Sequence, residues 1–207
     1  MKNTLKYIVC IALIMATLLC AVGCSDVYNG SAALSDDATH VVTFEIDKYG
    51  KVEIELYGEI APITVDNFVK LVKGGHYDNS YFHRIIDGFM AQGGDIDGFV
   101  DGRSTGNFST IKGEFSGNGV NNPIKHVKGT ISMARTGMPD SASTQFFIVL
   151  ETSYGNSYSL DGSYAAFGKV VSGMEIIETM SRGWSSDLLP SASRPKINKA
   201  IVQTVNR

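Results

Sequence analysis

The strongest constraint on the fold is a two-residue alternation of apolar and polar side chains in short, successive segments. Every second residue from Val42 to Ile46 is apolar, and the same alternation returns from Val52 to Leu56. A period of two is typical of a strand that buries one face. Lys48-Tyr49-Gly50 separates the two segments and supplies a glycine for a tight turn. The pattern therefore predicts an antiparallel hairpin.

Helical spacing of apolar residues occurs in two segments. The first begins at Pro62 and stops at Gly74-Gly75, and the second covers Met174–Ser181. Asp95–Pro123 is rich in Gly, Asn and Ser without periodicity, which is typical of a functional or mobile loop. Many short strands with two helices favour a mainly β fold, a closed antiparallel barrel, because closure removes exposed strand edges. The remaining predicted strands are Tyr81–Ile86, Phe89–Gln92, Thr130–Ala134, Gln145–Leu150, Ala165–Val171 and Ile197–Val205.

The N-terminus has the features of a lipoprotein signal peptide over residues 1–23. Lys2 and Lys6 precede an apolar run, Tyr7–Val22, which is too short to span a bilayer comfortably. The run ends in Ala21-Val22-Gly23-Cys24, which resembles the lipobox of bacterial lipoproteins, with Ala in place of the usual Leu. We expect Cys24 to be lipidated, and an uncleaved N-terminal anchor is the alternative. Either way, the domain is expected at the cell membrane, on its extracytoplasmic face.

Composition divides the rest of the chain and excludes one class of partner. Residues 24–40 begin at the lipidated cysteine and are rich in Ser, Ala, Asp and Asn, which predicts a flexible tether, and residues 41–207 form the folded domain. All three cysteines lie at or before Cys24, so the domain has no disulfide framework. Residues 1–23 contain two of the 18 basic residues and none of the 21 acidic ones. The remaining chain is therefore modestly acidic and is not expected to bind nucleic acid.

Arg84 is the unusual residue of the predicted strands, because an unpaired guanidinium inside an apolar strand is expensive to bury. Spacing leaves two explanations open: a structural ion pair, or a cation at the wall of a pocket. In extended chain, Met90 and Gln92 share one face, and Gln145 and Phe147 share another. Amides that share a face with large apolar groups suit a shallow groove better than a dry core.

Several motifs, in this order along the chain, resemble those of the cyclophilin family of peptidyl-prolyl cis–trans isomerases. Residues 82–95 read Phe-His-Arg-Ile-Ile-x-Gly-Phe-Met-x-Gln-Gly-Gly-Asp, and the resemblance extends from about Val41 to Val205. It implies a closed eight-stranded antiparallel barrel capped by two α-helices, with the active groove on the outer face. The other matching motifs are Ser132-Met133-Ala134, Ser143-x-Gln145-Phe146-Phe147-Ile148, Leu160-Asp161-Gly162 and Phe167-Gly168-Lys169-Val170.

The resemblance also implies roles for particular residues, with no cofactor and no metal. Arg84 and Gln92 match catalytic positions, Gln92 and Gln145 hold the substrate backbone, and Ala134 and Arg135 pair with the peptide main chain. The proline ring would enter a pocket whose matching residues are Phe89, Met90, Phe147 and Leu160, with Tyr164 as a further aromatic wall. The expected partners are proline-containing peptides and unfolded proteins, bound by a monomer that the N-terminal lipid holds at the membrane.

Two positions depart from the commonest eukaryotic pattern of the family. Ser159 stands where that pattern has Trp, and Tyr164 stands where it has a pocket His. Tyr still offers an aromatic wall and a hydroxyl, so activity should survive. The missing indole removes an apolar wall and a donor, so we expect weak inhibition by cyclosporin; nanomolar inhibition of the purified domain would contradict this.

Other chemistries find less support in the sequence. His40, His76 and His126 lack metal-ligand spacing, and Phe99 occupies the position where a calcium loop over 95–101 needs Asp or Asn. No Gly-x-Ser-x-Gly elbow of a serine hydrolase occurs. The competing function is a non-catalytic cyclophilin-like module that binds proline-containing segments. A pure binder could lose Arg84 freely, so its presence favours the enzyme.

Overall fold

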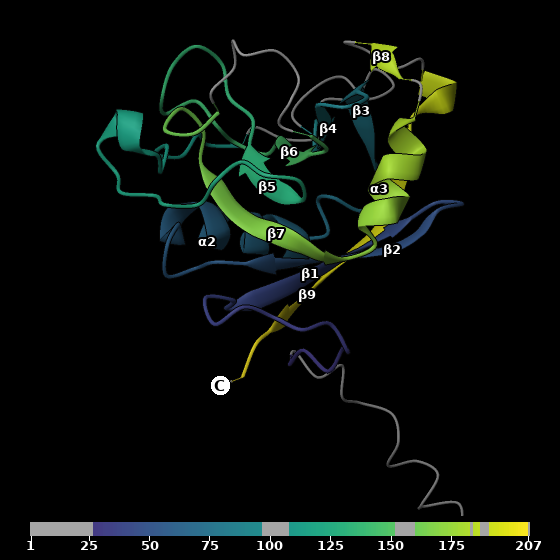
Figure 1. Ribbon diagram of the computed structural model, residues 1–207, viewed down its shortest axis with the longest axis horizontal. Coiled ribbons are helices and arrows are strands. Elements are labelled where there is room, and N and C mark those ends of the chain that lie inside the picture. Colours follow the sequence, from purple (N-terminus) through teal and green to yellow (C-terminus); the bar gives the residue numbers. More distant parts are fainter. Residues whose placement is uncertain (1–26, 97–107, 152–159, 183, 187–190, 207) are drawn as a thin grey trace, which may run out of the picture.

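The computed structural model describes residues 27–96, 108–151, 160–182, 184–186 and 191–206, and these form a closed β-barrel (Figure 1). Eight strands follow one another around the barrel in the order β4-β6-β5-β7-β2-β1-β9-β3, and the pairing of β3 with β4 closes it. All pairings between these strands are antiparallel, as predicted. The strands are β1 (His40–Ile46), β2 (Gly50–Leu56), β3 (Ser80–Ile86), β4 (Met90–Gly93), β5 (Thr130–Met133), β6 (Phe146–Val149), β7 (Ala166–Ser172) and β9 (Lys196–Thr204).

Two helices complete the barrel, as the sequence predicts. Helix α2 (Pro62–Lys73) and helix α3 (Met174–Ser181) lie on opposite sides of the barrel in Figure 1. Both contribute buried side chains to the core that fills its interior. Short pieces that the pattern did not predict are the strand β8 (Ser185–Ser186), which pairs with β3, and the 3₁₀ turns η2 (Ser116–Asn118) and η3 (Ser191–Ser193).

Aromatic rings dominate the centre of the barrel. Phe44, Phe68 and Phe146 are fully buried, and their ring centroids lie 5.4–6.4 Å apart. Edge-to-face and offset contacts at such distances add to the free energy gained by burying the rings themselves. The rigid core gives the outward-facing side chains of the same strands fixed positions.

A buried carboxylate caps helix α2 from a distant part of the chain. The N-cap residue Ala61 offers no side-chain hydrogen bond. Glu114, only 2% exposed, instead accepts the backbone N–H groups of Ile63 and Thr64 at 3.1 and 2.7 Å, and the Thr64 hydroxyl at 2.7 Å. The two backbone donors are among the N–H groups that a helix leaves unsatisfied at its start. The contact ties the loop that carries Glu114 to α2.

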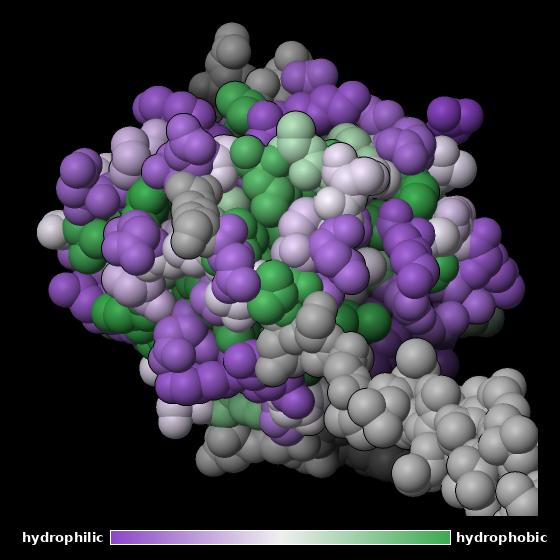
Figure 2. Space-filling model, turned by 90° about the horizontal axis from the view of Figure 1, so that it is seen from below, coloured by the Kyte–Doolittle hydropathy of each residue, from purple (hydrophilic) through white to green (hydrophobic). Residues whose placement is uncertain are grey.

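The segment before β1 differs from the flexible tether expected over residues 24–40. From Val27 onward it lies against the barrel: the N–H of Tyr28 donates to the Thr204 carbonyl at 2.8 Å, and its hydroxyl donates to Glu53 at 3.1 Å. The N–H of Ser35 donates to the Glu55 carboxylate at 2.7 Å. Figure 1 shows this segment beside the C-terminus, at the lower end of the barrel. Figure 2 shows the molecule from below, with hydrophilic and apolar residues intermixed on that face.

The predicted signal peptide and Cys24 lie outside the described residues. Within the described part of the chain, no helix is long and apolar enough to cross a membrane.

Candidate functional site

An open pocket of about 330 Å³ lies on the outside of the barrel. It brings together every residue predicted for catalysis and substrate binding except Gln145, which lies just behind the wall. Ile86 also lines the pocket and was missed, although its two-residue spacing from Arg84 on one strand could have identified it. The lining residues are Arg84, Ile86, Phe89, Met90, Gln92, Ala134, Arg135, Phe147, Leu160 and Tyr164.

Strand alternation explains why apolar side chains face outward here. On β6, Phe146 belongs to the barrel core, whereas Phe147 belongs to a second, smaller apolar cluster outside it. On β4, Ala91 faces the core and its neighbours Met90 and Gln92 face the pocket. Successive side chains of a strand point to opposite faces, so two adjacent strands furnish both the core and the pocket floor.

A β-bulge determines the direction of the Arg84 side chain. Phe82 pairs with Gly93 and Arg84 pairs with Gln92, so two residues of β3 oppose one residue of β4. Without this extra residue, Phe82 and Arg84 would share a face. The bulge instead leaves Phe82 fully buried in the core and turns Arg84 into the pocket. Of the two explanations left open by the sequence, the structure therefore supports a cation at a pocket wall.

A chain of amide hydrogen bonds fixes the polar side of the pocket. Gln145 Nε2 donates to Asp95 Oδ1 at 3.0 Å, and Gln92 Nε2 donates to Gln145 Oε1 at 2.8 Å. A carboxylate only accepts, so Asp95 sets the orientation of both amides in turn. Gln92 Oε1 consequently faces Arg84 Nη1, at 3.5 Å, the long limit of a hydrogen bond. Gln145 thus acts on the pocket through Gln92.

The apolar side of the pocket is built from rings and aliphatic groups. Phe147 and Tyr164 meet edge to face, with centroids 5.6 Å apart and planes at 89°. Met90 and Phe147 are almost completely buried, and the partly buried Phe89 and Leu160 pack against them. The result is a concave apolar surface with a guanidinium at its edge.

Arg135 forms a second cationic edge of the pocket. Its guanidinium carbon lies 4.7 Å from the centroid of the Tyr164 ring and 5.2 Å from that of Phe115. Its Nε donates to the Ser163 carbonyl at 2.8 Å. The neighbouring Ala134 lines the pocket, and its N–H donates to the Gln145 carbonyl at 2.9 Å. Both predicted main-chain binding residues therefore lie at the pocket.

The arrangement supplies a cation beside an apolar cavity. The described residues contain no group of three or more His, Cys, Asp or Glu side chains that could hold a metal ion. They also offer no nucleophile with an adjacent general base in the pocket lining. Ser159, at the position of the family's Trp, lies outside the described residues. What this geometry can do is bind an apolar group and stabilise electron density next to it.

Comparisons with known proteins agree on one family. Residues 41–206 match the model of the family "Cyclophilin type peptidyl-prolyl cis-trans isomerase/CLD". The chain is 44% identical to peptidyl-prolyl cis-trans isomerase B of Bacillus subtilis over 140 residues, 68% of this chain and 90% of that protein. It is 37% identical to peptidyl-prolyl cis-trans isomerase A of Dickeya dadantii over 159 residues, 76% of this chain and 79% of that protein.

Solved structures agree with the sequence relatives. A cyclophilin-type peptidyl-prolyl cis-trans isomerase from Cryptosporidium parvum superposes with a TM-score of 0.62 at 26% identity, covering 80% of this chain and 98% of that one. A second structure of that protein, determined in the presence of the dipeptide Ala-Pro, gives a TM-score of 0.61 at 26% identity, covering 79% of this chain and 98% of that one.

Proposed function

The chain belongs to the cyclophilin-type peptidyl-prolyl cis–trans isomerase family, and from that premise we propose that its pocket isomerises X–Pro bonds with Arg84 as the catalytic cation. The observation that carries the proposal is the position of Arg84 at the wall of an apolar pocket, within 3.9 Å of Met90 Sδ and 3.5 Å of Gln92 Oε1. The predicted ring-binding residues line the same pocket.

The barrier to rotation comes from amide resonance. A peptide bond has partial double-bond character, which gives a barrier of about 18–20 kcal/mol, so X–Pro isomerisation takes tens to hundreds of seconds unaided. In the twisted transition state the resonance is lost, and the prolyl nitrogen becomes pyramidal and gains a basic lone pair. A guanidinium near that nitrogen interacts more strongly with the twisted state than with either planar isomer. This difference is what accelerates the reaction.

The other pocket residues hold the substrate while the bond rotates. The apolar surface around Phe147 takes the proline ring, and the edge of the pocket leaves the preceding carbonyl free to turn. Partial exclusion of water strengthens the interaction of Arg84 with the nitrogen. Lowering the barrier by about 7 kcal/mol in total would give roughly five decades of rate.

The test is a protease-coupled assay on an Ala-Pro peptide with wild type, Arg84→Ala and Arg84→Lys. We expect Arg84→Ala to lower kcat/KM by about 10²–10³-fold, the loss typical of removing one transition-state donor. Arg84→Lys should recover part of the activity, because it restores the charge without the planar fork. The exposed Arg182, which does not line the pocket, provides the matched control Arg182→Ala, with unchanged activity expected.

Two outcomes of this assay separate the enzyme from a binding module. If Arg84→Ala loses most of its kcat/KM while its affinity for the peptide stays close to wild type, catalysis by Arg84 is supported. If wild type itself is inert but binds the peptide, the chain is a non-catalytic module for proline-containing segments.

We also propose where the isomerase works. The lysines, apolar run and lipobox-like sequence of residues 1–24 support export and lipidation of Cys24. A monomer anchored there would act on proline-containing, unfolded polypeptides at the extracytoplasmic face of the membrane and assist their folding. Metabolic labelling with a radioactive fatty acid should label the wild-type protein and not Cys24→Ala. Size-exclusion chromatography with light scattering on residues 25–207 checks the monomer.

A further inference from the structure

His126 lies directly behind the pocket without lining it. Its side chain is buried, with 6% of the residue exposed, and its ring stacks on the pocket residue Phe147 with centroids 6.1 Å apart and planes at 16°. The mechanism described above gives this imidazole no role. His126 is thus a buried, ionisable ring in contact with Phe147, the residue proposed to bind the proline ring.

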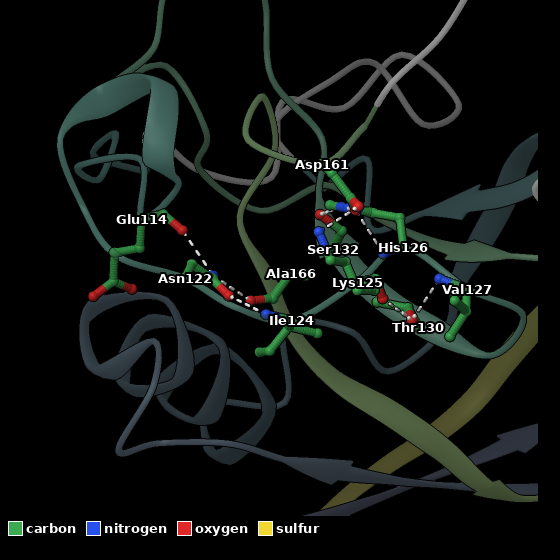
Figure 3. Close-up of polar contacts among 10 residues, drawn as sticks. All are labelled: Glu114, Asn122, Ile124, Lys125, His126, Val127, Thr130, Ser132, Asp161 and Ala166. Carbon is green, nitrogen blue, oxygen red and sulfur yellow. Dashed lines mark hydrogen bonds and ion pairs between the residues drawn. The ribbon is translucent and has the colours of Figure 1, made fainter. Parts of the chain in front are cut away.

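Both ring nitrogens of His126 have partners on different parts of the chain (Figure 3). Nδ1 lies 3.0 Å from Asp161 Oδ1, and Nε2 lies 3.0 Å from Ser132 Oγ on β5. The backbone N–H of His126 also donates to Asp161 Oδ1, at 2.9 Å. One carboxylate oxygen thus holds both the ring and the main chain of this residue.

The protonation state of His126 follows from its surroundings. Burial lowers the pKa of the imidazole below its ordinary value of 6.5, against the opposing effect of Asp161. The ring is therefore neutral at pH 7. Since Asp161 can only accept, Nδ1 carries the proton, and Nε2 accepts the Ser132 hydroxyl. Each group in this set of contacts then has one consistent donor or acceptor role.

Asp161 belongs to the turn that forms the opposite wall of the pocket. It directly follows Leu160, and the N–H groups of Ser163 and Tyr164 donate to the Leu160 carbonyl at 3.0 and 3.1 Å. Leu160 and Tyr164 both line the pocket. Lys125 lies 3.2 Å from the other oxygen of Asp161, at an exposed position. Asp161 therefore anchors the turn. Of its side-chain partners His126 and Lys125, the former is buried and the latter is exposed.

We propose that His126 is a positioning residue that sets the spacing of the two walls between which the proline ring binds. Its ring face holds Phe147, and its Nδ1–H holds the Leu160–Gly162 turn through Asp161. This inference rests on the function proposed above and deepens it, because it assigns affinity for the proline ring to a residue that never touches the substrate. Arg84 is not among the contacts of His126, so the rotation step itself should be little affected.

The experiment compares His126→Phe, Asp161→Ala and the double variant. His126→Phe keeps a ring against Phe147 and removes both hydrogen bonds of the imidazole. Asp161→Ala keeps the imidazole and its contact with Ser132. It removes the carboxylate that anchors the turn, together with that carboxylate's contacts to the His126 N–H and Lys125. We expect each single variant to raise KM, and the dissociation constant of an Ala-Pro peptide measured by NMR titration, by about tenfold. We expect kcat to stay within about twofold. Both changes break the same link, the hydrogen bond between His126 and Asp161. The double variant should therefore bind the peptide no more weakly than the weaker-binding of the two single variants.

Tyr57→Phe is the matched control, since it removes a buried hydrogen bond to Glu55 outside the pocket. It should lower the melting temperature without changing KM. Unchanged KM and affinity in the folded Asp161→Ala variant would overturn the proposal, as would a loss confined to kcat or effects that add in the double variant. Asp161 is partly exposed, so its variant decides the matter even if His126→Phe fails to fold. A wild type that binds peptide without turnover would refute the proposed function and leave the affinity test valid.

Discussion

Single side chains in this pocket depend on the groups behind them. Asp95 orients Gln145, Gln145 orients Gln92, and the Gln92 carbonyl oxygen meets the Arg84 guanidinium. Gln145 was predicted to hold the substrate backbone, and this stays a prediction. Its side chain accepts a hydrogen bond from Gln92 and is not among the residues that line the pocket. Its amide therefore determines which end of Gln92 faces Arg84, the arginine proposed as catalytic.

This dependence predicts the effect of removing the link. Gln145→Leu leaves the Gln92 amide free to present its NH₂ group to Arg84, which would repel the guanidinium. We expect kcat/KM in the peptide assay to fall by about tenfold, equivalent to about 1.4 kcal/mol. Asp95→Asn should be milder, because asparagine retains an oxygen that can accept from Gln145. Equal activity of Gln145→Leu and wild type would show that the orientation of Gln92 has no influence on the reaction.

Buried histidines predict how stability responds to pH. His83 and His126 are 8% and 6% exposed, and burial is the leading cause that lowers the pKa of each below 6.5. The unfolded chain therefore binds protons that the folded chain does not, and stability is lost as the pH falls below about 6.5. Each such group should decrease the free energy of unfolding by up to about 1.4 kcal/mol per pH unit.

Urea titrations at pH 7.5, 6.5 and 5.5 measure this dependence. The decrease should be concentrated below pH 6.5 and should become shallower in His83→Gln, which removes one of these groups. A midpoint that does not move between pH 7.5 and 5.5 would contradict the argument.

At the scale of elements, the sequence predicted the positions of the strands and helices well. It did not predict which way a side chain points where that depends on the register between two strands. The alternation over Val42–Ile46 and the helical spacing after Pro62 reflect burial of one face, which each segment encodes locally, so their boundaries agree within about two residues. The direction of Arg84 depends on the bulge between β3 and β4. A bulge is a property of the pairing of two strands, and single-strand alternation cannot reveal it. The family resemblance, and not the spacing, identified Arg84 as a pocket residue.

The hydrogen bonds from the start of helix α2 to Glu114 predict that this residue, distant in the sequence, contributes to the stability of the fold. Glu114 accepts three hydrogen bonds at the start of this helix, and two of the donors are backbone groups without an intrahelical partner. We expect Glu114→Ala to lower the free energy of unfolding by about 4 kcal/mol or more, since each of three hydrogen bonds to a charged group contributes about 1.5–3 kcal/mol. Glu114→Gln should lose about half as much, because one oxygen remains.

Chemical denaturation with urea measures both changes. The exposed Glu59 lies just before the same helix, and Glu59→Gln removes the same charge without the hydrogen bonds. That control should stay within about 0.5 kcal/mol of wild type, as is usual for surface substitutions. If Glu59→Gln and Glu114→Gln were equally destabilising, net charge and not capping would explain the effect.

For the molecule as a whole, the least predictable feature was the path of the segment before β1. Its Ser-, Ala- and Asp-rich composition predicted a flexible tether, but the N–H groups of Tyr28 and Ser35 are bonded to the barrel. Composition reports the apolar surface that a segment can bury and carries no information about hydrogen bonds made by its backbone. Among residues 27–39, which the structure describes, Ala38 is the one buried apolar residue, at 1% exposed. A single alanine is a weak signal of this packing in the sequence.

This attachment predicts the orientation of the enzyme if Cys24 carries a lipid as proposed. Two residues, Ser25 and Asp26, lie between Cys24 and Val27, where the chain joins the barrel. The three extended steps from Cys24 to Val27 reach at most about 11 Å. The attached segment lies at the end of the barrel that holds the C-terminus, whereas β3, β4 and β6, which carry the pocket floor, lie at the other end (Figure 1). The membrane would therefore lie beneath the C-terminal end, and the pocket would open away from the lipid toward its substrates.

Fluorescence quenching in liposomes tests this orientation with the full-length, lipidated protein. One fluorophore is attached at Asn206→Cys, beside the C-terminus, and another at Met138→Cys, which is 69% exposed in the loop after the pocket residue Arg135. A quencher on the lipid headgroups should quench the label at 206 strongly and the label at 138 weakly. Inserting a flexible 20-residue linker between Asp26 and Val27 should weaken quenching at 206, because the barrel can then move away from the surface. Equal quenching at both positions without the linker would show that the attached segment does not orient the pocket.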